Sequence, residues 1–114
     1  MKLYGLKNCD TCKKALKALS AAGREMTFID VRADGVAADD LASWIRGHGM
    51  DAMVNTRSTT WRGLDEATRA RAGSPDGALA LLQEHPALMK RPVIVDGDSS
   101  HVGWTKDVQD RLLG

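Results

Sequence analysis

Hydrophobic and polar residues alternate near the start of the chain, and the spacing of the apolar residues then becomes helical. Residues 2–6 alternate as a strand does, and residues 26–31 form a second strand-like run. Between them, apolar side chains recur every three or four positions before Gly23, at Cys12, Ala15, Leu16, Leu19 and Ala22. A strand, a helix and a strand within about 30 residues predict a right-handed βαβ unit with parallel strands. Ligand sites of open α/β sheets gather at the carboxyl ends of such strands.

The middle of the chain has helical patterns instead. One predicted helix ends before Gly49 and has four residues on one face, Leu41, Trp44, Ile45 and His48. Ser74 followed by Pro75 is typical of the start of a second helix, which ends before Pro86. A weaker helix is predicted over residues 65–72. We therefore expect one domain spanning residues 1–114, with a helical insertion at about residues 36–88.

The C-terminal part predicts a β-hairpin and a last helix. Residues 92–95 and 101–103 flank the polar residues 96–100, which would form a five-residue hairpin loop. Thr105 can cap a helix that packs through Val108 and Leu112. The predicted fold class is α/β, with a βαβ…ββα sheet and an inserted helical lobe.

Composition and charge limit the partners of the chain. Its 114 residues, 43% apolar and 27% charged, are ordinary for one soluble globular domain. A net charge of +1 gives no overall field that would draw the protein to nucleic acid or to an anionic membrane. No signal peptide is recognisable at the N-terminus, and no stretch approaches the roughly 18 apolar residues of a membrane span. We expect a cytoplasmic monomer that binds neither nucleic acid nor membranes directly.

The two cysteines, Cys9 and Cys12, stand in a C-x-x-C spacing where the first strand meets the first helix. In a reducing compartment this spacing favours redox chemistry or metal binding over a structural disulfide. Free N–H groups at a helix N-terminus stabilise a thiolate, so Cys9 is the predicted nucleophile and Cys12 the resolving thiol. An alternative stays open, in which both are small buried residues of the helix start.

A zinc site would need two more ligands besides the cysteines. The three histidines, His48, His85 and His101, include no pair with the spacing of zinc ligands, so we predict no metal site. A different feature supports the redox interpretation. Pro92 stands at the head of a predicted strand, where thioredoxin-like folds place a proline, often cis, against the active thiol. A proline at the edge of a strand is the simpler alternative.

Three segments together carry a family resemblance: LYGLKNCDTCKKA at residues 3–15, NTRSTTWR at residues 55–62, and His85-Pro86 with Lys90-Arg91-Pro92. Over nearly its whole length the chain resembles the glutaredoxin-coupled arsenate reductase and Spx family, in particular its small YffB-like branch. The resemblance implies a thioredoxin-like sheet with a helical lobe, Cys9 as the nucleophile, and Arg91 beside it as an anion contact. It also implies Arg57 as a second anion contact, with Asn8 and Pro92 in the same site.

One departure from the family bears on the substrate. Arsenate reductases of the family carry a further arginine shortly after the hairpin, whereas this chain has His101-Val102-Gly103-Trp104. Each charge-assisted hydrogen bond that an anion loses is worth about 1.5–3 kcal/mol, so we expect poor arsenate reduction.

The function that we predict is a glutathione-linked thiol–disulfide reductase with Cys9 as nucleophile and Cys12 as resolving thiol. It would hold no bound cofactor, use glutathione as co-substrate, act on a small disulfide, and have glutaredoxin as a possible partner. Two alternatives stay open. One is an Spx-like, redox-sensitive binding partner of RNA polymerase, in which oxidation of the C-x-x-C pair changes affinity. The other is an arsenate reductase.

Overall fold

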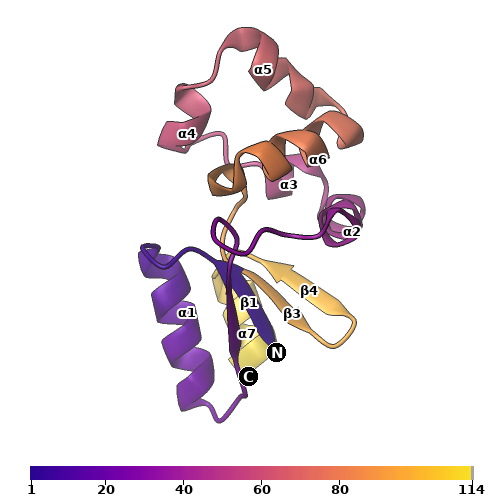
Figure 1. The fold of residues 1–114 in the computed structure, drawn as a ribbon. Coiled ribbons are helices and arrows are strands. Elements are labelled where there is room, and N and C mark those ends of the chain that lie inside the picture. Colours follow the sequence, from indigo (N-terminus) through magenta and orange to yellow (C-terminus); the bar gives the residue numbers. More distant parts are fainter. Residues whose placement is uncertain (114) are drawn as a thin grey trace. The chain divides into compact units, whose positions relative to one another are not determined.

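The computed structural model describes residues 1–113, and the chain divides into two compact units (Figure 1). One unit consists of residues 1–34 and the chain from Arg91 onward, and it contains all four strands. The other consists of residues 35–90 and is helical. The predicted insertion at about residues 36–88 corresponds to this helical unit. That the two units make up a single domain stays a prediction.

The first unit is built on a mixed four-stranded sheet with the strand order β2-β1-β3-β4. Strand β1 is parallel to β2 and antiparallel to β3, and β3 is antiparallel to β4. The predicted βαβ and ββα segments are therefore both present in one sheet. The strands are β1 (Lys2–Gly5), β2 (Thr27–Asp30), β3 (Val93–Asp96) and β4 (Ser99–Val102).

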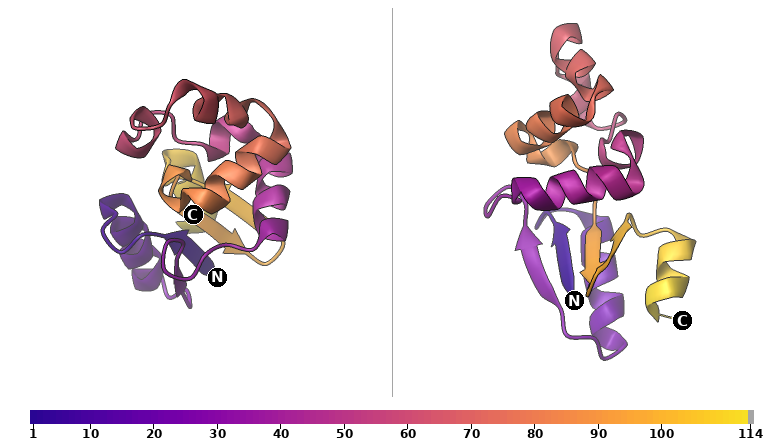
Figure 2. Two further views of the ribbon diagram at one scale, coloured as in Figure 1. Left: turned by 45° about the horizontal axis from the view of Figure 1, so that its top comes forward. Right: turned by 90° about the vertical axis from the view of Figure 1, so that its right-hand side faces the viewer.

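Two helices pack along this sheet, α1 (Asp10–Ala21) and α7 (Lys106–Leu113) (Figure 2). Leu3 of β1 lies opposite Ile94 of β3, and both helices pack against this pair. The buried residues of the shared core are Leu3, Cys12, Ala15, Leu19, Ile94, Val108 and Leu112. The three- and four-residue spacing therefore identified the buried face of α1. The predicted cap of α7 is also present, since the N–H of Val108 donates to Thr105 Oγ1 at 3.3 Å.

The β3–β4 hairpin is tighter than predicted. Asp96 pairs with Ser99, so two residues form the turn and the expected five-residue loop was wrong. Gly97 has a φ of +61° at the first central position, as a type II′ turn requires, and this turn matches the twist of the flanking strands. The polar residues Ser99 and Ser100 therefore continue the ladder as part of edge strand β4.

The two longer helices of the helical unit match the predicted ones, and the unit also contains short helices that were not predicted. The longer helices are α2 (Ala38–His48) and α6 (Pro75–Glu84), and Ser74 caps α6 by accepting the N–H of Gly77 at 3.1 Å. The predicted helix over residues 65–72 is divided into α5 (Glu66–Ala70) and the 3₁₀ turn η1 (Arg71–Gly73). Three short elements were not predicted: α3 (Met50–Met53), α4 (Thr59–Arg62) and η2 (Pro86–Leu88).

Apolar side chains are also buried in the helical unit. They come from helices α2 and α6 and from the segment around η2. Val54 and Met89 also form an isolated antiparallel bridge within this unit. The buried apolar residues are Leu41, Trp44, Ile45, Met53, Val54, Ala78, Leu81, Leu82, Leu88 and Met89. Within residues 1–113, no helix is both long and apolar enough to cross a membrane.

Candidate active site

Cys9 lies at the N-cap position of α1, directly after the loop that leaves β1. Its Sγ accepts the backbone N–H of Cys12 at 3.4 Å, and its carbonyl accepts the N–H of Lys13 at 3.0 Å. A helix N-terminus presents unpaired N–H groups and the positive end of the helix dipole. The Cys9 sulfur therefore sits where a negative charge is stabilised.

The pKa of the Cys9 thiol reflects two opposing effects. Burial raises the pKa, but hydrogen bonds from Cys12 and Arg91, together with the charge of Arg91, outweigh burial and lower it. Cys9 is half-buried, and it lines a cavity that is open to solvent. A thiol of lowered pKa that is open to solvent has the properties of a nucleophile.

Cys12 has the opposite environment. Only 1% of the residue is exposed, and it belongs to the core between α1 and the sheet. Burial, and then the neighbouring Cys9 thiolate, raise the pKa of Cys12 to about 12. The close packing depends on Gly5, because a Cβ on that residue would lie 2.6 Å from Cys12 Sγ. Cys12 is therefore a protonated thiol while Cys9 carries charge.

Arg91 lies beside Cys9, and Pro92 follows it directly before β3. The Arg91–Pro92 peptide bond is cis, Pro92 is buried, and its carbonyl accepts the N–H of Gly103 at 2.8 Å. Arg91 acts on Cys9 through both a hydrogen bond and its charge. The structure thus places Arg91 next to the two cysteines, and Pro92 belongs to the same unit. That Arg91 also binds a substrate anion stays a prediction.

A cavity of about 280 Å³ opens beside Cys9 within the sheet-containing unit. Its lining includes the predicted site residues Asn8, Cys9 and Arg91. The complete lining is Leu6, Lys7, Asn8, Cys9, Asp30, Arg32 and Arg91. Three cationic side chains, those of Lys7, Arg32 and Arg91, thus line the cavity that contains Cys9.

Asp30 and Arg32 were missed by the sequence reasoning. Asp30 is the last residue of β2, and Arg32 comes two residues later; β2 is parallel to β1 and adjacent to it. The carboxyl ends of adjacent parallel strands meet at one edge of the sheet, so polar residues after β2 could have been identified as neighbours of Cys9.

Asp30 is the only charged side chain that is buried in the described part of the chain, with 8% of the residue exposed. Its Oδ1 accepts the backbone N–H groups of Arg32 at 2.9 Å and Ala33 at 3.0 Å. Hydrogen bonds from Ala33, Arg32 and Lys7, and the charge of Lys7, outweigh burial and lower the pKa of Asp30. The residue is therefore a carboxylate that joins the end of β2 to the loop before Cys9.

A second, apolar cavity of about 190 Å³ lies on the Cys12 side of the same loop. It shares Leu6 and Lys7 with the first cavity. The residues around it are Leu6, Lys7, Cys12, Lys13, Leu16 and Phe28. The two cysteines therefore line different cavities.

Arg57, the second predicted anion contact, belongs to the helical unit, residues 35–90. It is exposed, and its backbone N–H donates to Asn55 Oδ1 at 3.1 Å. Its role in anion binding stays a prediction. Among residues 1–113, no three His, Cys, Asp or Glu side chains are grouped in a way that could hold a metal ion.

Comparison with known proteins identifies the family of the chain. The model of the ArsC family matches residues 4–111. An uncharacterized protein of Haemophilus influenzae is 41% identical over 104 residues, which are 91% of this chain and 90% of that protein. The global transcriptional regulator Spx of Bacillus subtilis is 27% identical over 115 residues, which are 97% of this chain and 85% of the regulator.

Solved structures of similar fold indicate the same family. The YFFB protein has a TM-score of 0.91 at 35% identity, covering 99% of this chain and 98% of its own. A putative ArsC family related protein from Bacteroides fragilis has a TM-score of 0.83 at 25% identity, covering 97% of this chain and 95% of its own. These structures confirm the predicted α/β, thioredoxin-like fold class. Taken together, the sequence match, the fold and the relatives make this chain a member of the ArsC family, the family of arsenate reductases and Spx, in its YffB-like branch.

Proposed function

We propose that this protein is a glutathione-linked thiol–disulfide reductase in which Cys9 is the nucleophile and Cys12 the resolving thiol. Family membership supports thiol-based redox chemistry, with a reductase or an Spx-like role. The observation that carries the finer proposal is the contrast between the two sulfurs. The pKa of Cys9 is lowered at a helix N-terminus, whereas burial raises the pKa of Cys12 to about 12 only three residues away.

The first step is attack by the Cys9 thiolate on one sulfur of a small disulfide. A bond forms between Cys9 Sγ and that sulfur, the substrate S–S bond breaks, and the other substrate sulfur leaves as a thiolate. The departing thiolate takes a proton from solvent. Arg91 supports this step by stabilising the attacking thiolate.

The second step uses Cys12. Its pKa is raised partly by the charge of the Cys9 thiolate, and that charge disappears when the mixed disulfide forms. Cys12 then loses its proton to solvent, attacks Cys9 Sγ, and expels the remaining half of the substrate as a thiolate. Two molecules of glutathione reduce the resulting Cys9–Cys12 disulfide, and they leave as one molecule of glutathione disulfide. We place this cycle in the cytoplasm, in a monomer that has glutaredoxin as a partner.

The test is turnover of 2-hydroxyethyl disulfide with glutathione, followed by consumption of NADPH through added glutathione reductase. Cys9→Ser should lose turnover, whereas Cys12→Ser, mixed with the disulfide in the absence of glutathione, should still react once and accumulate a mixed disulfide that mass spectrometry detects. Cys12→Ala is the matched control for the loss of the buried sulfur. Equal turnover of the parent and Cys9→Ser would overturn the proposal, and so would a parent without turnover.

A second candidate is a redox-sensitive regulator. It is favoured by relatives named global transcriptional regulator Spx and by the placement of both cysteines within one turn of α1. In this function a Cys9–Cys12 disulfide would change affinity for RNA polymerase. Pull-down of the polymerase by reduced and by oxidised protein tests it, and equal recovery in both states would exclude a redox-controlled interaction.

A further inference from the structure

We propose that Arg32, supported by Lys7, forms an anion-binding subsite in the Cys9 cavity that selects thiols and disulfides carrying carboxylates. The inference rests on the proposed reductase function, whose substrate class it specifies. Arg32 and Lys7 both line the cavity that contains Cys9 and Arg91. Both have exposed side chains, so a ligand in this cavity can reach them from solvent.

The charges around the cavity leave Arg32 available for a ligand. The charge of Arg91 acts on the Cys9 thiolate, and the charge of Lys7 acts on the Asp30 carboxylate. Arg32 contacts Asp30 through its backbone N–H, and among residues 1–113 its guanidinium forms no salt bridge. A guanidinium presents a planar pair of donors that matches a carboxylate. Arg32 is therefore the cation whose charge is not already balanced.

The backbone of Arg32 is held in place although its side chain is exposed. Its N–H donates to Asp30 Oδ1 at 2.9 Å, and the N–H of the preceding Val31 donates to the carbonyl of Gly5 at 2.9 Å. Gly5 ends β1, the strand that leads to the Cys9 loop. Strand β1 therefore holds the backbone next to Arg32 and also leads into the loop that carries Cys9. A subsite needs this kind of support because a flexible anchor contributes little to orientation.

Formation of the mixed disulfide strengthens the subsite. While Cys9 is a thiolate, two negative groups, Cys9 and Asp30, face the three cations of the cavity. When Cys9 forms a bond to the substrate sulfur, its charge leaves with the departing thiolate. The net positive charge of the groups that line the cavity then rises. A carboxylate on the bound half of the substrate is therefore held more strongly than in the encounter complex.

The experiment measures single turnovers in a Cys12→Ser background, so that the reaction stops at the mixed disulfide and needs no glutathione. Second-order rate constants are measured for the neutral 2-hydroxyethyl disulfide and for the dianionic 3,3′-dithiodipropionate. Arg32→Gln should lower the ratio of anionic to neutral rate constants on the order of tenfold at low salt, the loss of one charge-assisted contact. Arg32→Lys should restore part of that ratio, and added salt should reduce the difference.

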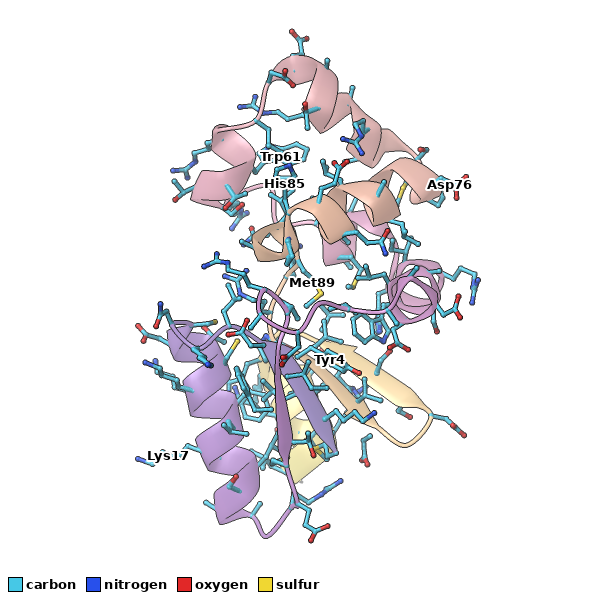
Figure 3. All side chains as sticks on the ribbon, in the orientation of Figure 1. Tyr4, Lys17, Trp61, Asp76, His85 and Met89 are labelled. Carbon is cyan, nitrogen blue, oxygen red and sulfur yellow. The ribbon has the colours of Figure 1, made fainter. Side chains whose placement is uncertain are left out.

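Lys17→Gln is the matched control because it removes the same charge from an exposed position of α1. Figure 3 shows the Lys17 side chain extending away from the sheet. Equal slowing of both disulfides by Arg32→Gln would overturn the inference, because it would indicate a structural role. An equal change of the ratio in Lys17→Gln would also overturn it, because it would indicate a general field effect. A parent that reacts with neither disulfide would instead overturn the reductase function itself.

Discussion

Replacing Gly5 by alanine tests how closely the Cys12 thiol is packed against β1. A Cβ on Gly5 would lie 2.6 Å from Cys12 Sγ and 3.1 Å from Cys12 Cβ, and both atoms belong to a fully buried side chain. Overpacking of this kind costs about 1–3 kcal/mol. Alanine at a position with extended backbone otherwise gains up to about 0.5–1 kcal/mol over glycine. We therefore expect a net loss of about 1–2 kcal/mol, or about 4–8 °C in Tm for a chain of this size.

Urea denaturation under reducing conditions measures this loss. Gly47→Ala in α2 is the matched control, because a Cβ there meets nothing within 4 Å and should stabilise the helix by about 0.5–1 kcal/mol. If the Cys12 sulfur causes the clash, the double variant Gly5→Ala/Cys12→Ala should lose less than the two single variants combined, by about 1 kcal/mol or more. A fully additive double variant would refute the reasoning, as would a Gly5→Ala protein as stable as the parent.

The remaining predictions concern the chemistry of the site. Alkylation of Cys9 by iodoacetamide in a Cys12→Ser variant should accelerate with rising pH around a midpoint below about 8.5, since the pKa of Cys9 is lowered; a midpoint at or above that value contradicts the assignment. Mild oxidation should give a monomer that is lighter by two hydrogens, as seen by mass spectrometry, because C-x-x-C at a helix start brings the two cysteines within disulfide range. Intermolecular dimers alone would contradict this. Arg91→Ala should raise the pKa of Cys9 and the glutathione concentration needed for half-maximal turnover. Arg91→Lys should also raise that concentration but should keep the pKa of Cys9 below its value in Arg91→Ala. If neither variant changes the alkylation of Cys9 or the dependence on glutathione, Arg91 does not belong to the site. Arsenate turnover, assayed with glutathione and glutaredoxin, should be poor because the stretch at residues 101–104, shortly after the hairpin, contains no arginine; turnover of several per second, an ordinary rate for an enzyme, would refute this expectation.

The sequence predicted well those parts of the fold that depend on local pattern. The spacing of Cys12, Ala15 and Leu19 identified the buried face of α1, and Ser74 with Pro75 marked the start of α6. These signals work because a helix buries one stripe of side chains and needs a polar cap at its first turn. The position of Cys9 at the start of α1 followed from the same reasoning.

Other features depend on contacts that a local pattern does not contain. The short helices α3 and α4 have four residues each, too few for an apolar period to be visible. The hairpin turn was misjudged because polarity was taken to mark a loop, although an edge strand can carry serines. Asp30 and Arg32 were missed because their importance comes from the parallel pairing of β1 and β2, which brings the ends of distant segments together.

The unequal burial of the two sulfurs gives an intramolecular disulfide a preferred direction of opening. An incoming thiol can reach Cys9, whereas Cys12 is enclosed by the core, so attack at Cys9 must expel Cys12. A thiol whose pKa is raised by burial is a poor leaving group, and exchange slows as the leaving thiol becomes more basic. In the proposed cycle, reopening of the Cys9–Cys12 bond by glutathione would therefore be slower than its formation, and the oxidised protein would be the form that accumulates during turnover.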